Sequence, residues 1–256
     1  MARLVVLGSA AIVPTMEHDN THMVLEGEES VVLIDCASSP IARLYRAGIH
    51  FEDLTDFILT HFHPDHVASV PLLLNNMWML GRRRALRVYG LHHCLNRVED
   101  TMLAHSWDEW PDFFPVAFHK ILERDNQLLL ENADFRITTW PVRHYVPTIG
   151  LRIENKRTGF VTAYSCDSAP TPSLVDLGRN ADIYIHEAAG GDGIGHSSAR
   201  QAGEIAAAAG AKRLVILHYE VFGRDGPVDT TRLVPEAQQA FKGPVELAND
   251  FSEYEI

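Results

Sequence analysis

The chain has 256 residues, of which 46% are hydrophobic and 22% are charged, so it can bury a sizeable core as one large domain or as two. Its formal net charge of −12 disfavours nucleic acid as a partner, because that binding depends largely on Lys and Arg neutralising phosphates. No apolar run approaches the roughly 20 residues of a membrane span, so no membrane contact is expected. The basic cluster at 81–87 is interpreted as a solvated turn.

The first residues allow two interpretations. Residues 1–15 place one arginine before an apolar stretch, as a short signal peptide does. Gly8 interrupts that stretch after a strand-length segment, which favours a first β-strand and a cytoplasmic protein. Cys36, Cys94 and Cys166 are widely spaced, which argues against a disulfide framework and for small buried side chains.

The predicted elements follow one another without a clear linker, so a single domain over residues 1–256 is expected. In the first half, short apolar runs predict strands, and apolar residues at helical spacing predict helices. The strands are expected at 3–8, 22–27, 30–36, 56–60 and 86–90, and the helices at 38–49, 65–80 and 91–103. The aromatic-rich stretch 105–121 is expected to be a loop with a short helical piece, because Pro111 and Pro115 interrupt any regular pattern.

The second half repeats this arrangement. Its strands are expected within 126–142, 148–167, 181–187, 213–219 and 245–250. A helix is predicted at 197–211, opened by a serine cap and closed by Gly210, and a last helix within 228–241. Two β-rich halves that each end in helices predict an α+β fold, in which two sheets pack together with helices outside.

One short segment, Ile58 to Val70 (ILTHFHPDHVASV), concentrates side chains of the metal-ligand type: His61, His63, Asp65 and His66. Strict alternation places His61 and His63 on the same side of an extended segment. Asp65 and His66 follow at the turn and can reach the same pocket from another direction. Four such residues at one turn suit two neighbouring cations better than one. A chance run of surface histidines is the less favoured alternative.

Several other apolar strands also end in residues that can bind metal. They are His144, Asp167, His186, Glu187 and His218. Each one alone would be explained as a structural histidine or a turn carboxylate. The repetition at several strand ends instead predicts loops that converge on one rim of a sheet.

The motif HFHPDH, residues 61–66, resembles the H-x-H-x-D-H motif of the metallo-β-lactamase superfamily, and later single His, Asp and His residues follow in the expected order. The resemblance covers nearly the whole chain, from VVLGSAA and VVLIDC to the AND before the C-terminus. It implies a four-layer αββα sandwich with a dinuclear metal centre at one edge of the two sheets. Zinc is the expected metal, and manganese or iron also fit. The resemblance assigns His61, His63 and His144 to one metal, Asp65, His66 and His218 to the other, and Asp167 as the bridge.

Within the superfamily, residues 186–219 resemble the ribonuclease Z-like branch in the His-Glu-Ala segment, the His-Ser-Ser-Ala helix start and the final ligand strand. In that branch the glutamate and the later histidine form a pair beside the metals, which implies Glu187 and His196 here. True ribonuclease Z carries a protruding tRNA-binding arm between the ligands that correspond to His144 and Asp167. Only 22 residues separate these two, so no arm is expected.

These residues predict a metal-dependent hydrolase, in the first place a phosphodiesterase that uses a metal-bridging hydroxide on a small phosphodiester. Asp65 is expected to receive a proton from the nucleophile. His196, oriented by Glu187, is expected to give a proton to the leaving alkoxide. The alternative for His196 is a plain helix entry with no catalytic role.

Other functions stay open. The same attack hydrolyses a sulfate ester, a thioester or a lactone, and a ribonuclease Z-like RNA-processing nuclease shares the ligand set. A metal-binding interaction protein on this scaffold is the non-enzymatic alternative. Trp107 and Trp110 are interpreted as a wall for the substrate, with a subunit contact or core packing as alternatives. The expected partner is a small-molecule ester rather than a nucleic acid or a membrane, and a homodimer is compatible with the sequence.

Overall fold

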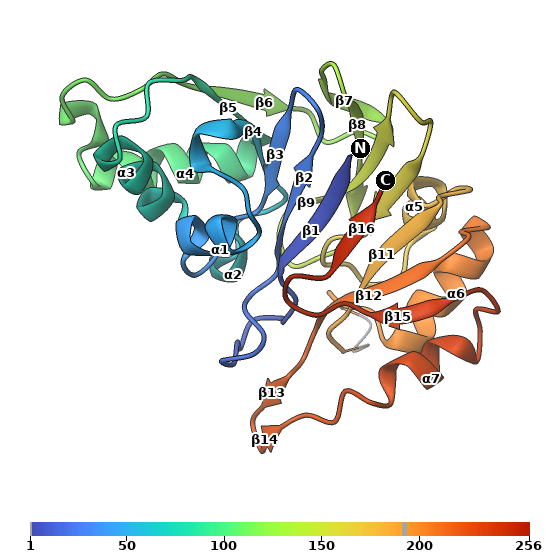
Figure 1. The fold of residues 1–256 in the computed structure, drawn as a ribbon. Helices are drawn as coiled ribbons and strands as arrows, with labels where there is room; N and C mark the ends of the chain where they lie inside the picture. The colour runs from blue at the N-terminus through green and yellow to red at the C-terminus, as the bar shows by residue number, and fades with distance from the viewer. Residues whose placement is uncertain (1, 191–193) are drawn as a thin grey trace.

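The computed structural model describes residues 2–190 and 194–256, and two large β-sheets form its centre (Figure 1). The first sheet contains β1 (Arg3–Gly8), β2 (His22–Glu26), β3 (Val31–Ile34), β4 (Leu54–Leu59), β5 (Leu86–Leu91), β6 (Val116–Ile121) and β16 (Glu253–Glu255). The second contains β7 (Gln127–Glu131), β8 (Phe135–Val142), β9 (Thr148–Asn155), β10 (Val161–Tyr164), β11 (Ile183–Ala188), β12 (Leu214–Tyr219) and β15 (Val245–Leu247). A short hairpin, β13 (Phe222–Gly223) and β14 (Gly226–Pro227), follows β12.

The helices lie in two separate groups, one on the outer face of each sheet (Figure 1). The first group contains α1 (Pro40–Arg46), α2 (Pro64–Val67), α3 (Val70–Met79) and α4 (His92–Ala104), with the 3-10 turns η1 (Phe51–Asp53) and η2 (Trp107–Glu109). The second contains α5 (Pro172–Leu177), α6 (Ala199–Ala209) and α7 (Leu233–Gln238). The predicted α+β fold, an αββα sandwich, is therefore confirmed. Among the described helices, none combines the length and the apolarity needed to cross a bilayer.

Strand alternation explains why the apolar runs of the sequence are almost continuous. Leu4 and Val6 of β1 face the second sheet, whereas Val5 and Leu7 face the helices, and all four are buried. A strand that is covered on both faces needs apolar side chains at every position. One core therefore lies between the sheets and one lies under each layer of helices.

Both sheets are mixed in the same way. β1, β2 and β3 pair antiparallel and β3 to β6 pair parallel. Likewise β7 to β10 pair antiparallel, and β10, β11, β12 and β15 pair parallel. Parallel neighbours end at the same edge of their sheet. The sequence segments that follow these strands can therefore meet at that edge.

Two predicted elements differ in the structure. The single helix expected at 65–80 is two helices, α2 and α3, separated at Ala68 and Ser69. Pro71 lies in the first turn of α3, where its missing N–H cannot continue the hydrogen bonds of α2, and the Ser69 hydroxyl donates to the Ser38 carbonyl. The expected loop at 105–121 ends in β6, which forms because β5 offers it a parallel partner and not because of a local pattern.

The basic cluster at 81–87 is not only a solvated turn, because Arg82 is fully buried. Its guanidinium donates to the carbonyl oxygens of Phe51, Leu54, Arg84 and Ala85 at 2.6–3.2 Å. Burial lowers the pKa of Arg82 to about 10, which leaves it charged at neutral pH. Arg82 thus links the backbone segments at η1 and at the start of β5. Because its guanidinium is buried and fully engaged, it is not available to a polyanion.

Replacing this arginine should destabilise the fold. In Arg82→Met, several buried carbonyl groups lose their donor, and we expect the free energy of unfolding to fall by about 3 kcal/mol or more. Arg84→Met is the matched control, since Arg84 is exposed and should change it by less than about 0.5 kcal/mol. Urea denaturation measures both. Equal stability of the two variants would contradict the structural role of Arg82.

Candidate metal centre

The predicted ligands come from separate strand ends and meet at one edge of the sandwich. His61 and His63 follow β4 in extended backbone. Pro64 then starts α2, and this turn brings Asp65 and His66 back toward the two histidines. The remaining predicted ligands also lie near strand ends. His144 follows β8, Asp167 follows β10 by a few residues, and His218 is the second-to-last residue of β12.

Of the compact groups of ligand atoms among the described residues, two consist of predicted ligands alone. In one, His61, His63 and His144 have their ligand atoms within 4.8 Å of one another. In the other, the same limit holds for Asp65, His66, Asp167 and His218. Each group contains residues that the family resemblance assigned together, and their use as metal ligands stays a prediction.

Asp167 lies between the two groups. Its Oδ2 is 3.9 Å from His61 Nε2 and 3.8 Å from His144 Nε2, which belong to the first group. The same oxygen is 3.5 Å from His66 Nε2 and 3.1 Å from His218 Nε2, which belong to the second. One carboxylate oxygen therefore faces both sets of imidazoles, as a bridging ligand must.

Hydrogen bonds fix which ring nitrogen each histidine presents to the cluster. His144 Nδ1 donates to the carbonyl oxygen of Gly195 at 2.8 Å, and His218 Nδ1 lies 3.1 Å from the hydroxyl of Thr21. In each ring the Nε2 lone pair is then directed at the cluster. Partners of this kind orient the histidines of metal sites and raise their basicity.

Asp35 provides the same support for the motif histidines. Its Oδ2 accepts from His66 Nδ1 at 2.8 Å, and both of its oxygens accept from the hydroxyl of Thr60. The Thr60 oxygen lies 3.1 Å from His61 Nδ1, and the Cys166 sulfur lies 3.7 Å from the same nitrogen. One buried carboxylate thus orients ligands of both groups.

The cluster has two neutral histidines and the unmet bonds of a cation site. Burial lowers the pKa of His61 and His144, the latter to about 4, so both are neutral near pH 7. Burial opposes ionisation of Asp167, but His218 and His66 outweigh it and hold its pKa well below the usual range. His61 Nε2, His66 Nε2 and Asp167 Oδ1 are buried without a hydrogen-bond partner among the described residues. Such atoms are costly unless a ligand satisfies them, and N/O donors of this kind suit zinc-like cations.

A cavity of about 460 Å³ gives access to the cluster. His63, Asp65 and Asp167 line it from the metal side. His196 and Tyr145 line it as well, beside apolar residues from the loop after β1. The space is large enough for a phosphate and part of the groups attached to it.

Glu187 and His196 form the expected pair at this cavity. Glu187 is buried in β11, and its Oε1 lies 3.1 Å from His196 Nδ1. The same oxygen accepts the backbone N–H groups of Ser168 and Ser197 at 3.0 Å each. Burial raises the pKa of Glu187, and its hydrogen bond with His196 counteracts this rise. The His196 ring is held parallel to that of His218, with centroids 6.0 Å apart.

Three aromatic or imidazole candidates lie elsewhere. His186, a strand-end residue that looked like a ligand, points to the helix side of β11, with its ring centroid 5.3 Å from that of Tyr184. Trp107 and Trp110 do not line the cavity but pack against the core under α1 to α4, where Trp110 stacks on Trp78 at 5.0 Å. The structure thus supplies the contacts of the core-packing alternative for the two tryptophans.

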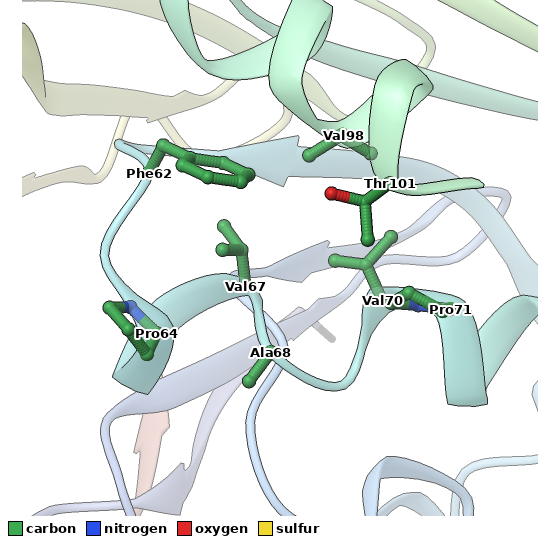
Figure 2. Close-up of a pocket in the computed structure, with 8 residues that line it drawn as sticks. All are labelled: Phe62, Pro64, Val67, Ala68, Val70, Pro71, Val98 and Thr101. Carbon is green, nitrogen blue, oxygen red and sulfur yellow. The ribbon is translucent and has the colours of Figure 1, made fainter. Parts of the chain in front are cut away.

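A second, apolar pocket of about 190 Å³ lies on the other side of the motif segment (Figure 2). It lies between Phe62, α2, the start of α3 and α4. Thr101 is its one polar lining residue among those the structure describes, and its hydroxyl donates to the Arg97 carbonyl. This pocket therefore brings no acid, base or ligand to the chemistry.

The sequence interpretation missed some residues of the site. Asp35 follows β3 just as His61 follows β4, so the strand-end pattern contained a signal for it. Thr21 and Thr60 carry no such signal, because a hydroxyl beside a strand is common. Gly195 acts through its backbone carbonyl, which no side-chain pattern reveals.

Comparison with known proteins identifies the class. A family model described as "Beta-lactamase superfamily domain" matches residues 31–219, and the chain belongs to this family. Together with the His/Asp cluster, this makes the protein a metal-dependent hydrolase of the metallo-β-lactamase fold, as expected.

Individual relatives agree with the ribonuclease Z-like branch. Ribonuclease BN of Cronobacter sakazakii is 28% identical, with 97% of this chain and 98% of that protein covered. Ribonuclease Z of Methanothermobacter thermautotrophicus is 24% identical, with 100% and 97% covered. Among solved structures, the metallo-β-lactamase fold protein YhfI of Bacillus subtilis superimposes with a TM-score of 0.82 at 23% identity, covering 99% of this chain and 98% of that one. The short form of human tRNase Z gives 0.77 at 22%, covering 99% of each.

One expectation is wrong. An acidic chain without an arm was expected to have a small ester and not a nucleic acid as its partner, yet proteins named ribonuclease BN and ribonuclease Z match it over nearly their whole length. The physical reason is that a net charge is summed over the whole surface, whereas a cation centre determines the local charge at the cavity.

The support from Asp35 predicts an effect on metal affinity. Asp35→Asn keeps the size of the side chain but replaces a charged acceptor for His66, so we expect zinc affinity to fall about 10- to 100-fold. Competition with a chromophoric chelator measures it. Asp56→Asn is the control, because Asp56 is equally buried but pairs with Arg87 outside the cluster. An unchanged affinity in Asp35→Asn, or an equal loss in the control, would argue against this role.

Proposed function

We propose that this protein is a phosphodiesterase that cleaves phosphodiester bonds of RNA with two divalent cations, zinc in the first place. The observation that carries the proposal is the position of Asp167 between two imidazole groups, beside the Glu187–His196 pair. Carboxylate-bridged cation pairs suit in-line displacement at phosphorus, because the attacking and the leaving oxygen both need stabilisation.

The proposed ligands follow the two groups. His61, His63 and His144 would hold one cation, Asp65, His66 and His218 the other, and Asp167 both. Cations at this cluster would supply a water of lowered pKa and neutralise negative charge on the phosphate. Availability in the cell decides between zinc, manganese and iron.

Asp65 is the proposed acceptor for the proton of the nucleophile. It lines the cavity, and its Oδ2 lies 3.6 Å from His66 Nε2, so it stands at the edge of the second group. A carboxylate at this place can accept a proton within hydrogen-bond reach and release it to solvent through the open cavity.

His196 is the proposed donor to the leaving oxygen. Its side chain is 22% exposed and lines the cavity, while its Nδ1 is held by Glu187. A carboxylate on Nδ1 stabilises the protonated imidazole and fixes the direction of its other nitrogen. Glu187 is itself fixed by the backbone N–H groups of Ser168 and Ser197, so it positions the ring and does not react.

RNA as the substrate class is supported by the curated relatives. The alignment with ribonuclease BN extends over 307 positions, more than the length of this chain, so that relative carries insertions that are missing here. Between His144 and Asp167 the structure has only β9, β10 and their turns. Contacts with RNA would therefore come from the cavity and its rim. A cytoplasmic location remains a prediction.

The role of His196 predicts a dependence on the leaving group. His196→Gln should reduce kcat on a dinucleotide roughly 100- to 10,000-fold, because an alkoxide leaves poorly without a proton. The loss should be much smaller for a p-nitrophenyl phosphodiester, whose phenolate leaves unaided. Steady-state kinetics with both substrates, and metal analysis to verify loading, test this. An equal loss on both substrates would contradict proton donation by His196.

The reaction class is tested with a substrate panel. The zinc-loaded protein should hydrolyse a short RNA and a p-nitrophenyl phosphodiester, and much more slowly the corresponding sulfate and carboxylic esters. Asp167→Asn should lose at least one equivalent of metal and the activity with it. Tightly bound metal combined with faster cleavage of another ester would shift the function to that ester. Bound metal with no hydrolysis would favour a binding protein.

A further inference from the structure

Tyr145 lines the cavity that gives access to the His/Asp cluster. Its side chain is among the cavity-lining residues and is 54% exposed, which is high for an aromatic ring beside a buried cluster. It follows the proposed ligand His144 directly. The ring centroids of Tyr145 and His144 are 5.0 Å apart, and those of Tyr145 and His196 are 6.0 Å apart.

Gly195 makes room for this ring. A Cβ atom at Gly195 would lie 2.4 Å from Cε2 of Tyr145, so only glycine permits the observed packing. The carbonyl oxygen of Gly195 is also the acceptor for His144 Nδ1. The same residue thus places the Tyr145 ring and orients a proposed ligand.

The backbone around Tyr145 is held in place. The backbone N–H of Ala169 donates to the carbonyl oxygen of Arg143 at 2.8 Å. The backbone N–H of Arg143 donates to the hydroxyl oxygen of Ser168. The Thr148 hydroxyl donates to the Val146 carbonyl. Hydrogen bonds to the segment after Asp167 therefore fix the backbone that carries the Tyr145 ring.

The charges of the cavity bear on how an aromatic ring could contribute to substrate binding. None of the described residues that line the cavity is Lys or Arg, and Glu220 adds a carboxylate to those of Asp65 and Asp167. The base and the ribose of a nucleotide carry no charge, so affinity beyond the phosphate has to come from stacking and hydrogen bonds. Stacking of a base on an aromatic side chain strengthens binding about 5- to 150-fold per base without regard to sequence.

We propose that Tyr145 is the platform on which the base next to the scissile phosphate stacks, on the side of the leaving oxygen, because His196 lies beside it. This proposal rests on the proposed function. It narrows the substrate class to phosphodiesters that carry a planar base on the leaving nucleoside. Tyr145 then determines specificity through binding of the base and not through the chemical step.

Binding measurements test the platform separately from catalysis. Isothermal titration of the zinc-loaded protein compares adenosine monophosphate with methyl phosphate, which has no base. Tyr145→Ala should weaken binding of adenosine monophosphate about 5- to 150-fold and reduce its preference over methyl phosphate, while Tyr145→Phe should keep that preference. Tyr45→Ala is the control, because Tyr45 on α1 is similarly exposed, at 50%, and lies outside the cavity.

Kinetics give the second readout. On a dinucleotide, Tyr145→Ala should raise KM with little change in kcat, while its metal content equals that of the wild type. If Tyr145→Phe is as weak as Tyr145→Ala, the hydroxyl acts and the stacking proposal is wrong. If Tyr145→Ala loses metal, or weakens both phosphates equally, the ring only braces His144 and the proposal is also wrong. If no phosphodiester is cleaved but the Tyr145-dependent preference persists, the proposed function fails and the platform stands.

Discussion

The buried carboxylate of Asp167 is the constraint on which the site depends. It is 2% exposed and faces imidazoles of both groups through one oxygen, while its other oxygen has no hydrogen-bond partner among the described residues. A buried charge is costly unless it is paired and hydrogen-bonded. The imidazoles satisfy it only in part. Cations between the rings would bind both the carboxylate and the imidazole lone pairs. An arrangement that costs free energy without metal would then stabilise the protein with metal bound.

The support for the imidazoles around this carboxylate comes from both halves of the sandwich. Asp35 and Thr60 follow strands of the first sheet, whereas Gly195 precedes a helix that packs on the second. The two halves therefore have to be packed together before the imidazoles can point at one another. This arrangement couples metal binding to the packing of the sheets, because a shift between them would separate His61 from His144.

What could be predicted from the sequence follows from how local each interaction is. The motif from His61 to His66 lies in one turn, and its alternation and spacing determine where its side chains point. The two-sheet fold was predictable as well, since most of its strands carry their own apolar run. Arg82 and β6 were not, because their partners are remote: backbone carbonyls of η1 and β5 in one case and the pairing edge of β5 in the other. The backbone acceptor on Gly195 has no signature in the sequence at all.

The acidic composition has a different meaning once the cavity is known. A chain of net charge −12 whose cavity is lined by no described Lys or Arg has little means of attracting a phosphate by itself. Most of the favourable charge would come from the cations, so substrate affinity and metal loading become one property of the same residues. The rim then has to supply only contacts that do not depend on charge, and an aromatic ring such as that of Tyr145 supplies them. In this arrangement the metals would bind the phosphate and the rim would bind the base. The contact with the base would then give selectivity for a nucleotide over free phosphate.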